Sequence, residues 1–238
     1  MVFIKKHLNR LHRSLAKKWR ELMLPRSFLR LGTRYGGWWV DSKSILEDPF
    51  LIDCGLGKDI SFPKEFLDRF SGRVIGLDPD PESISFCNKI LPKNMALRQQ
   101  AFWIEAGKTL EFNLARPKDK LPKGADGSGS LIKSHAYVIG SKKIKIKTTS
   151  LMDILMSENK EYCDILKLDI EGAEYEVIVD LCNSGNIKLV NQLLVEFHHG
   201  VTHYSISDTE KAILVLKSKG LELVHVEGRN HIFIRRLL

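Results

Sequence analysis

Four acidic side chains each follow a short, mostly apolar run, which places carboxylates where buried strands end. The acids are Asp53, Asp78, Asp169 and Glu196, and the runs before them are 50–52, 74–77, 165–168 and 193–195. Runs that do not strictly alternate are typical of strands buried on both faces of a parallel sheet. Ligands bind outside the carboxyl ends of such strands, so we expect the four carboxylates to meet at a binding site.

The first acid opens a glycine-containing loop with the sequence DCGLG at residues 53–57. Glycines directly after a strand let the backbone approach a ligand closely, because no Cβ stands in the way. Asp78 ends the next predicted strand, 25 residues after Asp53 (78 − 53). An acid at this place can accept hydrogen bonds from both hydroxyls of an adenosine ribose. The sequence therefore predicts a site for a cofactor that contains adenosine.

Two sequence motifs that are typical of other adenosine cofactors are absent, and their absence limits which cofactor the loop can bind. Nicotinamide cofactors use the fingerprint GxGxxG, and Ile60 stands where its third glycine would be. The sequence also has no GxxxxGK(S/T) loop for a triphosphate. A cofactor with adenosine but no pyrophosphate, S-adenosylmethionine, fits better than a nicotinamide dinucleotide.

Helix-length segments separate the predicted strands, so strand and helix alternate along the chain. These segments are 62–70, 81–90 and 175–181. Such alternation predicts an α/β fold with a doubly wound, mostly parallel sheet. A further helix is expected at 208–219, ended by Gly220 with a positive φ, and then a hairpin of strands at 221–226 and 231–235. The final strand pair is therefore expected to be antiparallel.

The segment 104–150 has a looser pattern, with a turn at Gly107 and a loop at 124–130. Alternating Lys and Ile residues at 142–148 are typical of an exposed strand. A segment of this length between the predicted strands of the sheet is expected to form substrate-specific structure.

Most of the net charge lies at the N-terminus. The chain carries +8, and residues 1–34 hold ten basic side chains and one acid, a charge of +9 that leaves −1 for residues 35–238. The first residues have the pattern of an amphipathic helix, which Pro25 ends. We place a basic arm at 1–31 and a catalytic domain at 32–238. Docking on a membrane surface, attraction of an anionic substrate and packing on the domain stay open for the arm, whereas a nucleic-acid footprint over the whole domain is not supported.

The four cysteines favour a reducing compartment. None forms a CxxC pair, so we expect free and mostly buried thiols, not disulfides or a zinc site. No run approaches the roughly 20 apolar residues that span a bilayer, and the first residues do not follow the order of a signal peptide. We expect a cytoplasmic protein, with peripheral membrane contact through the arm left open.

Several stretches resemble the FkbM-like family of S-adenosylmethionine-dependent methyltransferases. The most characteristic is LKLDIEGAE at 166–174, and DPDP at 78–81 is similar to the end of the family's second strand. Further matches lie at 36–38, 54–62, 128–131, 148–153 and 196–199. The matches span residues 32–236 in the expected order, so only the basic arm falls outside.

The resemblance implies a seven-stranded Rossmann-like sheet with an antiparallel last strand, binding of S-adenosylmethionine, and methylation that is commonly directed at hydroxyl oxygens. Carried over by position, the residues of the cofactor loop are Asp53, Cys54, Gly55 and Gly57. Asp78 is expected to hold the ribose, Phe102 to lie beside the adenine, and Asp169 beside the transferable methyl group. The sequence departs from the family where Lys58 replaces a frequent acid and where Asp78 stands in place of the commoner Glu.

Methyl transfer needs an acceptor in line with the sulfonium, exclusion of water, and often a base for the acceptor's proton. The residues expected at the reacting end of the cleft are Asp169, Glu171, Glu196, His198 and His199. His198 is the predicted general base, because an imidazole titrates near neutral pH. Alternatively, His198 or His199 only holds a loop, and Asp169 only orients Lys167 or the following helix. A metal site at His199 and His203 with nearby acids stays open, but we assign no metal ligand, because these histidines lie in a predicted loop where helical ligand spacing does not apply.

The expected activity is S-adenosylmethionine-dependent methylation of a hydroxyl group on a sugar, a glycan or a small molecule. An RNA or protein acceptor stays open, although the arm has few aromatic residues among its basic ones and nucleic acid is not the expected partner. A cofactor-binding module without catalysis is a further alternative, and acids at all four strand ends argue against it. An enzyme that uses NAD or a nucleotide sugar is disfavoured by the missing third glycine. The oligomeric state is not predicted.

Overall fold

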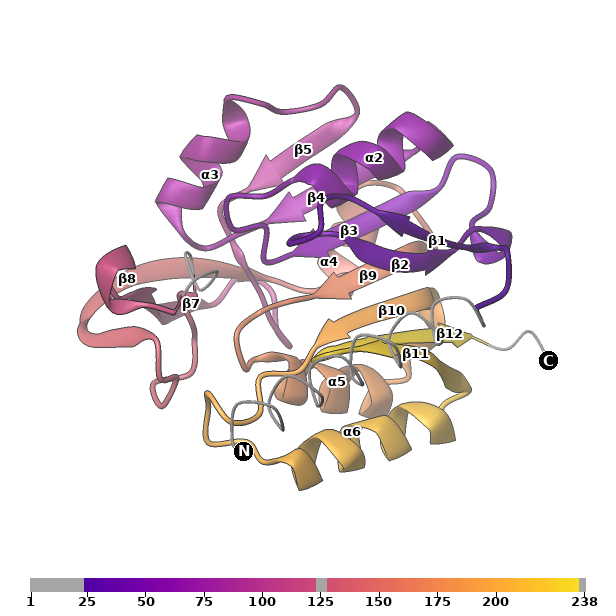
Figure 1. The fold of residues 1–238 in the computed structure, drawn as a ribbon. Coiled ribbons are helices and arrows are strands. Elements are labelled where there is room, and N and C mark those ends of the chain that lie inside the picture. Colours follow the sequence, from indigo (N-terminus) through magenta and orange to yellow (C-terminus); the bar gives the residue numbers. More distant parts are fainter. Residues whose placement is uncertain (1–23, 123–127, 236–238) are drawn as a thin grey trace, which may run out of the picture.

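The computed structural model describes residues 24–122 and 128–235, and its centre is a seven-stranded sheet (Figure 1). The strands, in spatial order, are β11 (Leu221–Glu227), β12 (Asn230–Arg235), β10 (Val190–Glu196), β9 (Cys163–Leu168), β3 (Phe50–Cys54), β4 (Arg73–Leu77) and β5 (Met95–Arg98). Among the described strands of this sheet, β12 alone runs in the opposite direction to the others. The predicted doubly wound α/β sheet with an antiparallel last strand is confirmed.

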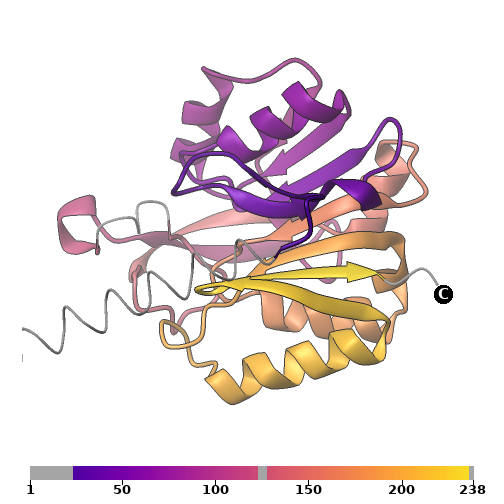
Figure 2. The same ribbon diagram turned by 45° about the vertical axis from the view of Figure 1, so that its right-hand side comes forward.

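Helices cover both faces of the sheet (Figure 2). One face carries α2 (Ser61–Phe70) and α3 (Pro81–Asn88), and the other carries α4 (Leu151–Ser157), α5 (Glu174–Asn183) and α6 (Ile206–Ser218). Successive strand residues point to opposite faces. Leu51 of β3 therefore packs with α2, whereas its neighbour Ile52 packs with α5. This two-sided burial is the reason why the strands appear in the sequence as apolar runs without strict alternation.

The helices begin and end at local sequence signals. The Asp80 side chain accepts a hydrogen bond from the first turn of α3, where Pro81 is the first residue. Helix α6 begins with a reciprocal pair of hydrogen bonds between Ser205 and Asp208. Gly220 follows α6 with a φ of +83°, as predicted.

A hairpin of β1 (Phe28–Leu31) and β2 (Trp38–Asp41) lies over the same face of the sheet as α2. Leu31 and Trp38 are buried in the core on that face. Residues 28–31, predicted as the end of the basic arm, belong to the folded domain instead, because pairing with β2 and burial of Leu31 hold them there. The amphipathic pattern at 1–23 lies outside the described residues.

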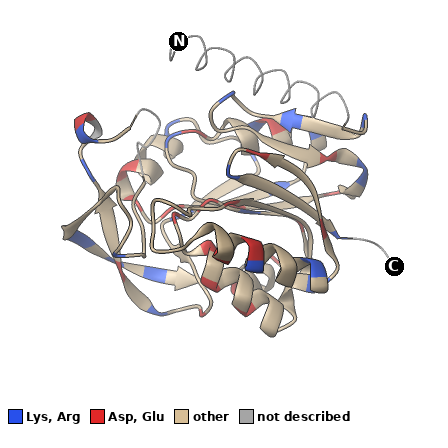
Figure 3. Cartoon of the chain, turned by 60° about the horizontal axis from the view of Figure 1, so that its bottom comes forward, with Lys and Arg blue, Asp and Glu red and all other residues tan. Residues whose placement is uncertain are grey.

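A smaller sheet extends from the side of the domain (Figure 1). Its strands, in spatial order, are β6 (Ala101–Phe102), β8 (Val138–Thr149) and β7 (Thr109–Ala115). Ile146 and Phe112 face a small core, while lysines alternate on the exposed side of β8, which confirms the exposed strand predicted at 142–148. Figure 3 shows basic residues recurring along the strands of this sheet. Of the predicted loop at 124–130, residues 124–127 lie outside the described part of the chain.

The four cysteines are free and buried, as expected. Burial raises the pKa of the Cys163 thiol well above its ordinary value, so this thiol stays protonated. Among the described helices, none combines the length and the hydropathy that a membrane span requires.

Asp164 ties the chain before β3 to strand β9. Its two carboxylate oxygens accept hydrogen bonds from Leu46 N at 3.1 Å and from Phe50 N at 2.9 Å. The Asp164→Ala substitution leaves the buried Phe50 amide without its acceptor, so we expect the free energy of unfolding to fall by about 1–3 kcal/mol. Urea denaturation measures this, with Asp68→Ala on the exposed side of α2 as the control. Equal stability of the two variants would contradict the role given to Asp164.

Candidate active site

One cavity of about 370 Å³ lies at the carboxyl ends of the central strands. Its lining includes the four acids at the ends of β3, β4, β9 and β10, namely Asp53, Asp78, Asp169 and Glu196. The parallel strands bring these residues together because each strand ends at the same edge of the sheet. The expected meeting of the four carboxylates is therefore observed.

The loop after β3 passes close to the end of β9, and this approach requires glycine. Gly55 has a φ of +85°, and a Cβ at this residue would lie 1.8 Å from the backbone oxygen of Asp169. Gly57 has a φ of +54°, and a Cβ there would meet no atom within 4 Å. Both glycines line the cavity. A ligand can thus lie directly against the backbone of this loop.

Asp78 is a buried carboxylate held by two backbone amides. Gly57 N donates to Oδ2 and Asp80 N donates to Oδ1, each at 2.8 Å. Burial raises the pKa of Asp78 to about 7, although the two amide hydrogen bonds oppose this shift. A carboxylate has about four acceptor positions, so each oxygen keeps one for a further donor. Two hydroxyl groups on adjacent carbons can donate one hydrogen bond to each of these two acceptor positions.

A buried lysine joins the glycine loop to the end of β9. Lys167 Nζ lies 2.9 Å from Asp53 Oδ1, donates to Gly55 O at 2.8 Å, and lies 3.6 Å from Asp169 Oδ2. Burial would lower the pKa of Lys167, but Asp53 and Asp169 outweigh it and raise the pKa above its ordinary value. The amine therefore stays charged and holds two strand ends together.

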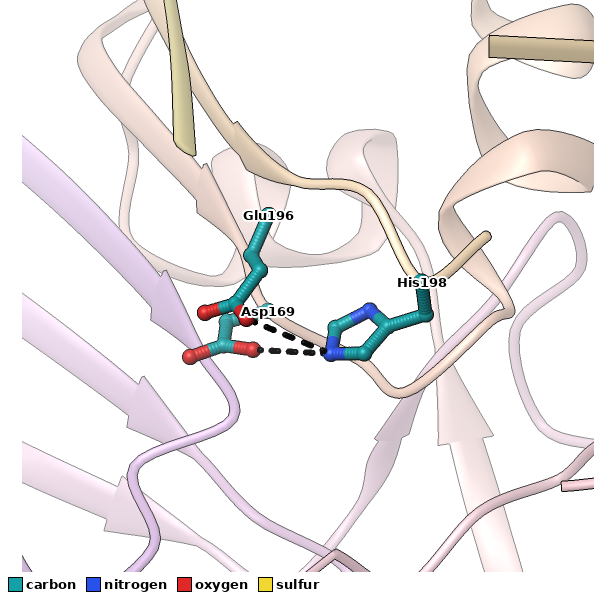
Figure 4. Close-up of side chains that lie close together, drawn as sticks. All are labelled: Asp169, Glu196 and His198. Carbon is teal, nitrogen blue, oxygen red and sulfur yellow. Dashed lines mark ion pairs between the residues drawn. The ribbon is translucent and has the colours of Figure 1, made fainter. Parts of the chain in front are cut away.

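His198 is buried, and its Nδ1 is committed to Glu174. This nitrogen lies 3.1 Å from Glu174 Oε1, and the same carboxylate accepts hydrogen bonds from His198 N and Gly172 N, each at 2.8 Å. An ionised carboxylate only accepts hydrogen bonds, so Nδ1 carries a proton. The opposite nitrogen, Nε2, faces Asp169 and Glu196 (Figure 4).

The surroundings of His198 argue against its predicted role as general base. Burial alone would lower its pKa, but Glu174, Glu171 and Asp169 outweigh burial and raise the pKa to about 10. A general base must be unprotonated at the working pH. These surroundings favour a charged imidazole over a free base, and the role of His198 as general base stays a prediction.

Glu171 is held by a second buried histidine. His135 Nδ1 accepts a hydrogen bond from Tyr137 N, so its proton is on Nε2, which lies 2.8 Å from Glu171 Oε2. Burial would raise the pKa of Glu171, but His198 and His135 lower it to about 2. Its backbone has a φ of +54°, and Ser130 Oγ donates to its carbonyl oxygen. Glu171 is therefore a fixed negative charge in a strained turn.

The carboxylates of Asp169 and Glu196 crowd one another at the ends of β9 and β10. Burial and then Glu196 raise the pKa of Asp169 to about 7, against the effect of Lys167. Arg229, in the turn between β11 and β12, places Nη2 2.7 Å from Glu196 Oε1. Asp169, Glu171 and Glu196 all line the cavity, as the sequence predicts.

His199 does not join this group. Its Nδ1 lies 3.0 Å from Thr209 Oγ1 in α6, and His203 Nδ1 lies 2.9 Å from Ser134 Oγ. Neither histidine is among the residues that line the cavity. Of the predicted cofactor residues, Cys54 and Phe102 do line it, and burial raises the pKa of the Cys54 thiol, so Cys54 is no nucleophile.

Some site residues escape the sequence reasoning. Glu174 is one of them, and its only signal is that, like Lys167, it is a charged residue within or beside an apolar run; charged residues in such places are buried when they are paired. The lining of the cavity also has aromatic residues: Trp38 belongs to the family-like stretch 36–38, whereas no motif indicates Tyr35, Phe112 and Tyr137. They come from the hairpin β1–β2 and from the smaller sheet, which are far from the strand ends in sequence.

Similar solved structures include fibrillarin proteins and another methyltransferase domain. The Methanococcus jannaschii fibrillarin pre-rRNA processing protein is 12% identical, with 79% of this chain and 67% of that chain covered and a TM-score of 0.44. The METTL16 MTase domain is 13% identical, with 78% and 58% covered and a TM-score of 0.41. Aeropyrum pernix fibrillarin in complex with natively bound S-adenosyl-L-methionine is 13% identical, with 80% and 66% covered and a TM-score of 0.39.

No curated protein matches the chain in sequence. The sequence profile of the family described as "Methyltransferase FkbM domain" matches residues 53–223, from the glycine loop into β11. This match covers more than half of the 238 residues and confirms the resemblance found in the motifs. The chain therefore belongs to the FkbM methyltransferase family, and its methyl donor is S-adenosylmethionine.

Proposed function

We propose that this protein transfers a methyl group from S-adenosylmethionine to a hydroxyl oxygen of a sugar, a glycan or a small hydroxylated molecule. The observation that carries the proposal is the combination, in the lining of one cavity, of carboxylates at the strand ends with aromatic rings. Carboxylates accept hydrogen bonds from hydroxyl groups, and aromatic faces pack against the C–H surfaces of a hydroxylated ring.

The cofactor fits the end of the cavity between β3 and β4. Each oxygen of Asp78 keeps one acceptor position for a ribose hydroxyl, and the glycines of the loop let the cofactor approach the backbone. Phe102, at the start of the smaller sheet, lines the same cavity and suits the adenine. When bound, S-adenosylmethionine supplies a methyl group on a positively charged sulfur.

The acceptor belongs at the opposite end, beside β9 and β10. Asp169 and Glu196 are the carboxylates there, and Phe112 and Tyr137 of the smaller-sheet region add aromatic surface. A hydroxyl that donates to one of these carboxylates directs its oxygen lone pair away from the carboxylate, which suits attack on a methyl carbon. These residues orient the acceptor.

A nucleic-acid acceptor is less well matched. The lining contains six acids, Asp53, Asp59, Asp78, Asp169, Glu171 and Glu196. The basic residues in it are Lys58, Lys167 and Arg229, and Lys167 is already paired with Asp53. A phosphate backbone entering this cavity would meet repulsion, since nucleic-acid sites carry an excess of positive charge. We therefore favour a neutral hydroxylated acceptor.

The role of Asp78 predicts a pH dependence of cofactor binding. Its pKa of about 7 in the free protein means that the carboxyl is protonated below this pH and then has fewer acceptor positions for the ribose. We expect the affinity for S-adenosylmethionine to fall about tenfold per pH unit below 7 and to level off above it. Isothermal titration calorimetry between pH 5.5 and 8.5, a range of about 3 units around this pKa, measures the profile.

The matched control for this profile is Asp78→Asn. We expect it to bind S-adenosylmethionine more weakly by about 1–3 kcal/mol above pH 7 and to lose the dependence that Asp78 causes. A wild-type profile without a slope, or an unchanged slope in Asp78→Asn, would show that Asp78 does not hold the ribose.

A methyl-transfer assay tests the acceptor class. The full chain is incubated with labelled S-adenosylmethionine and separate pools of oligosaccharides, small hydroxylated molecules, RNA and peptides. We expect label in a hydroxylated pool and a loss of about 100-fold or more in turnover for Asp169→Asn. Glu210→Gln, at an exposed acid of α6, should keep the wild-type rate. Transfer to RNA or peptides alone would refute the proposed acceptor class.

A further inference from the structure

His198 Nε2 and the carboxylates of Asp169 and Glu196 face one another around a common space, where a positive charge, either a proton on Nε2 or a metal ion, balances the carboxylates. The Nδ1 proton of His198 is directed to Glu174, so in a neutral imidazole Nε2 presents a lone pair. This lone pair faces Asp169 Oδ1 at 3.6 Å and Glu196 Oε1 at 3.9 Å (Figure 4). Lone pairs on all three atoms repel one another unless a proton or a metal ion lies between them.

The separations of Nε2 from Asp169 and Glu196 are too long for a short hydrogen bond and fit two ligands of one metal ion. Hydrogen bonds between charged nitrogen donors and carboxylates are about 2.7–2.9 Å long, so a proton on Nε2 makes no short bond to Asp169 or Glu196. Two ligand atoms bonded to one cation at about 2.1 Å can be up to about 4.2 Å apart, and both observed separations are within this limit. The three ligand atoms all lie within 4.8 Å of one another.

A third carboxylate, Glu171, is close but already engaged. Its Oε2 lies 3.3 Å from His198 Nε2 and accepts a hydrogen bond from His135 Nε2 at 2.8 Å. It therefore adds negative charge beside the three ligand atoms without having to bind the cation itself.

Neighbouring residues already hold the three side chains in place. Glu174 orients His198, and Lys167 lies 3.6 Å from the second oxygen of Asp169, Oδ2. Arg229 contacts Glu196 Oε1 at 2.7 Å, so a bound cation shares this oxygen with Arg229. A carboxylate that receives the other nitrogen of a ligating histidine is the usual support of a metal site, and Glu174 has this position.

The position of the group also gives an incoming ligand access. Asp169 follows β9 and Glu196 is the last residue of the adjacent parallel strand β10, and both line the cavity. Three protein ligands leave further coordination positions open toward that cavity. One imidazole nitrogen with two carboxylate oxygens suits Mn²⁺ or Zn²⁺ better than Mg²⁺, which prefers oxygen ligands alone.

We propose that Asp169, Glu196 and His198 form a binding site for a divalent transition-metal cation, and that the cation holds the acceptor's hydroxyl oxygen. The second half of this inference rests on the proposed function, and the first half does not. The bound oxygen attacks the methyl carbon, the carbon–sulfur bond breaks with its electron pair left on sulfur, and the hydroxyl proton passes to solvent water. A cation lowers the pKa of an oxygen that it binds, which makes loss of this proton easier.

Metal binding by the chain alone tests the site. The full chain is treated with a chelator, dialysed, and titrated with Mn²⁺ while electron paramagnetic resonance measures the free ion. We expect one Mn²⁺ per chain, with binding weakened tenfold or more in Asp169→Asn, Glu196→Gln and His198→Asn, as for loss of a ligand. Glu210→Gln should bind as the wild type does, and circular dichroism checks that each variant is folded. Parallel titrations with Zn²⁺ and Mg²⁺ should show tight and weak binding, respectively.

The outcomes separate this inference from the proposed function. No saturable binding of Mn²⁺ or Zn²⁺ to the folded wild type, or equal binding in Asp169→Asn, overturns the metal site even if methyl transfer is observed. Specific binding in the absence of any transfer to hydroxylated acceptors supports the site and contradicts the proposed reaction. Transfer that stops with chelator and returns with Mn²⁺ supports both.

Discussion

The ion pair between Lys167 and Asp53 is the interaction on which the rest of the site depends. Both side chains are buried, and Lys167 also donates to the carbonyl oxygen of Gly55. Removing one partner of a buried pair costs about 3–5 kcal/mol, because the other charge is left without compensation. The ends of β3 and β9 and the glycine loop are therefore held in one arrangement, and that arrangement sets where the cofactor and the acceptor can meet.

The remaining charges of the site are held in pairs in the same way. Glu174 accepts a hydrogen bond from the buried His198, and Glu171 lies 2.8 Å from Nε2 of the buried His135. Asp169 and Glu196 are the carboxylates of the acceptor end that have contact with the cavity and keep capacity for a ligand. The fold thus separates carboxylates that maintain the structure from those that can perform chemistry.

Additions to the central sheet complete the cavity. The hairpin β1–β2 contributes Trp38, and the smaller sheet contributes Phe112. These elements bring apolar surface to a sheet edge that would otherwise present mainly carboxylates and glycine backbone. Acceptor selectivity is accordingly expected in these added segments, because the strand ends are occupied with the cofactor and with charge pairing.

The sequence by itself determined the doubly wound sheet, its antiparallel last strand, the glycine loop and the meeting of four acids at one edge. Those features follow from local patterns, since buried strands, helix caps and tight turns each need particular residues within a few positions. Only the tertiary structure decided that His198 is hydrogen-bonded to Glu174 with further carboxylates close to its other ring nitrogen. It also decided that His199 contacts Thr209 and that residues 28–31 form a strand of the folded domain. Hydrogen-bond partners and pKa values depend on distances between segments far apart in the chain, and local pattern does not encode those distances.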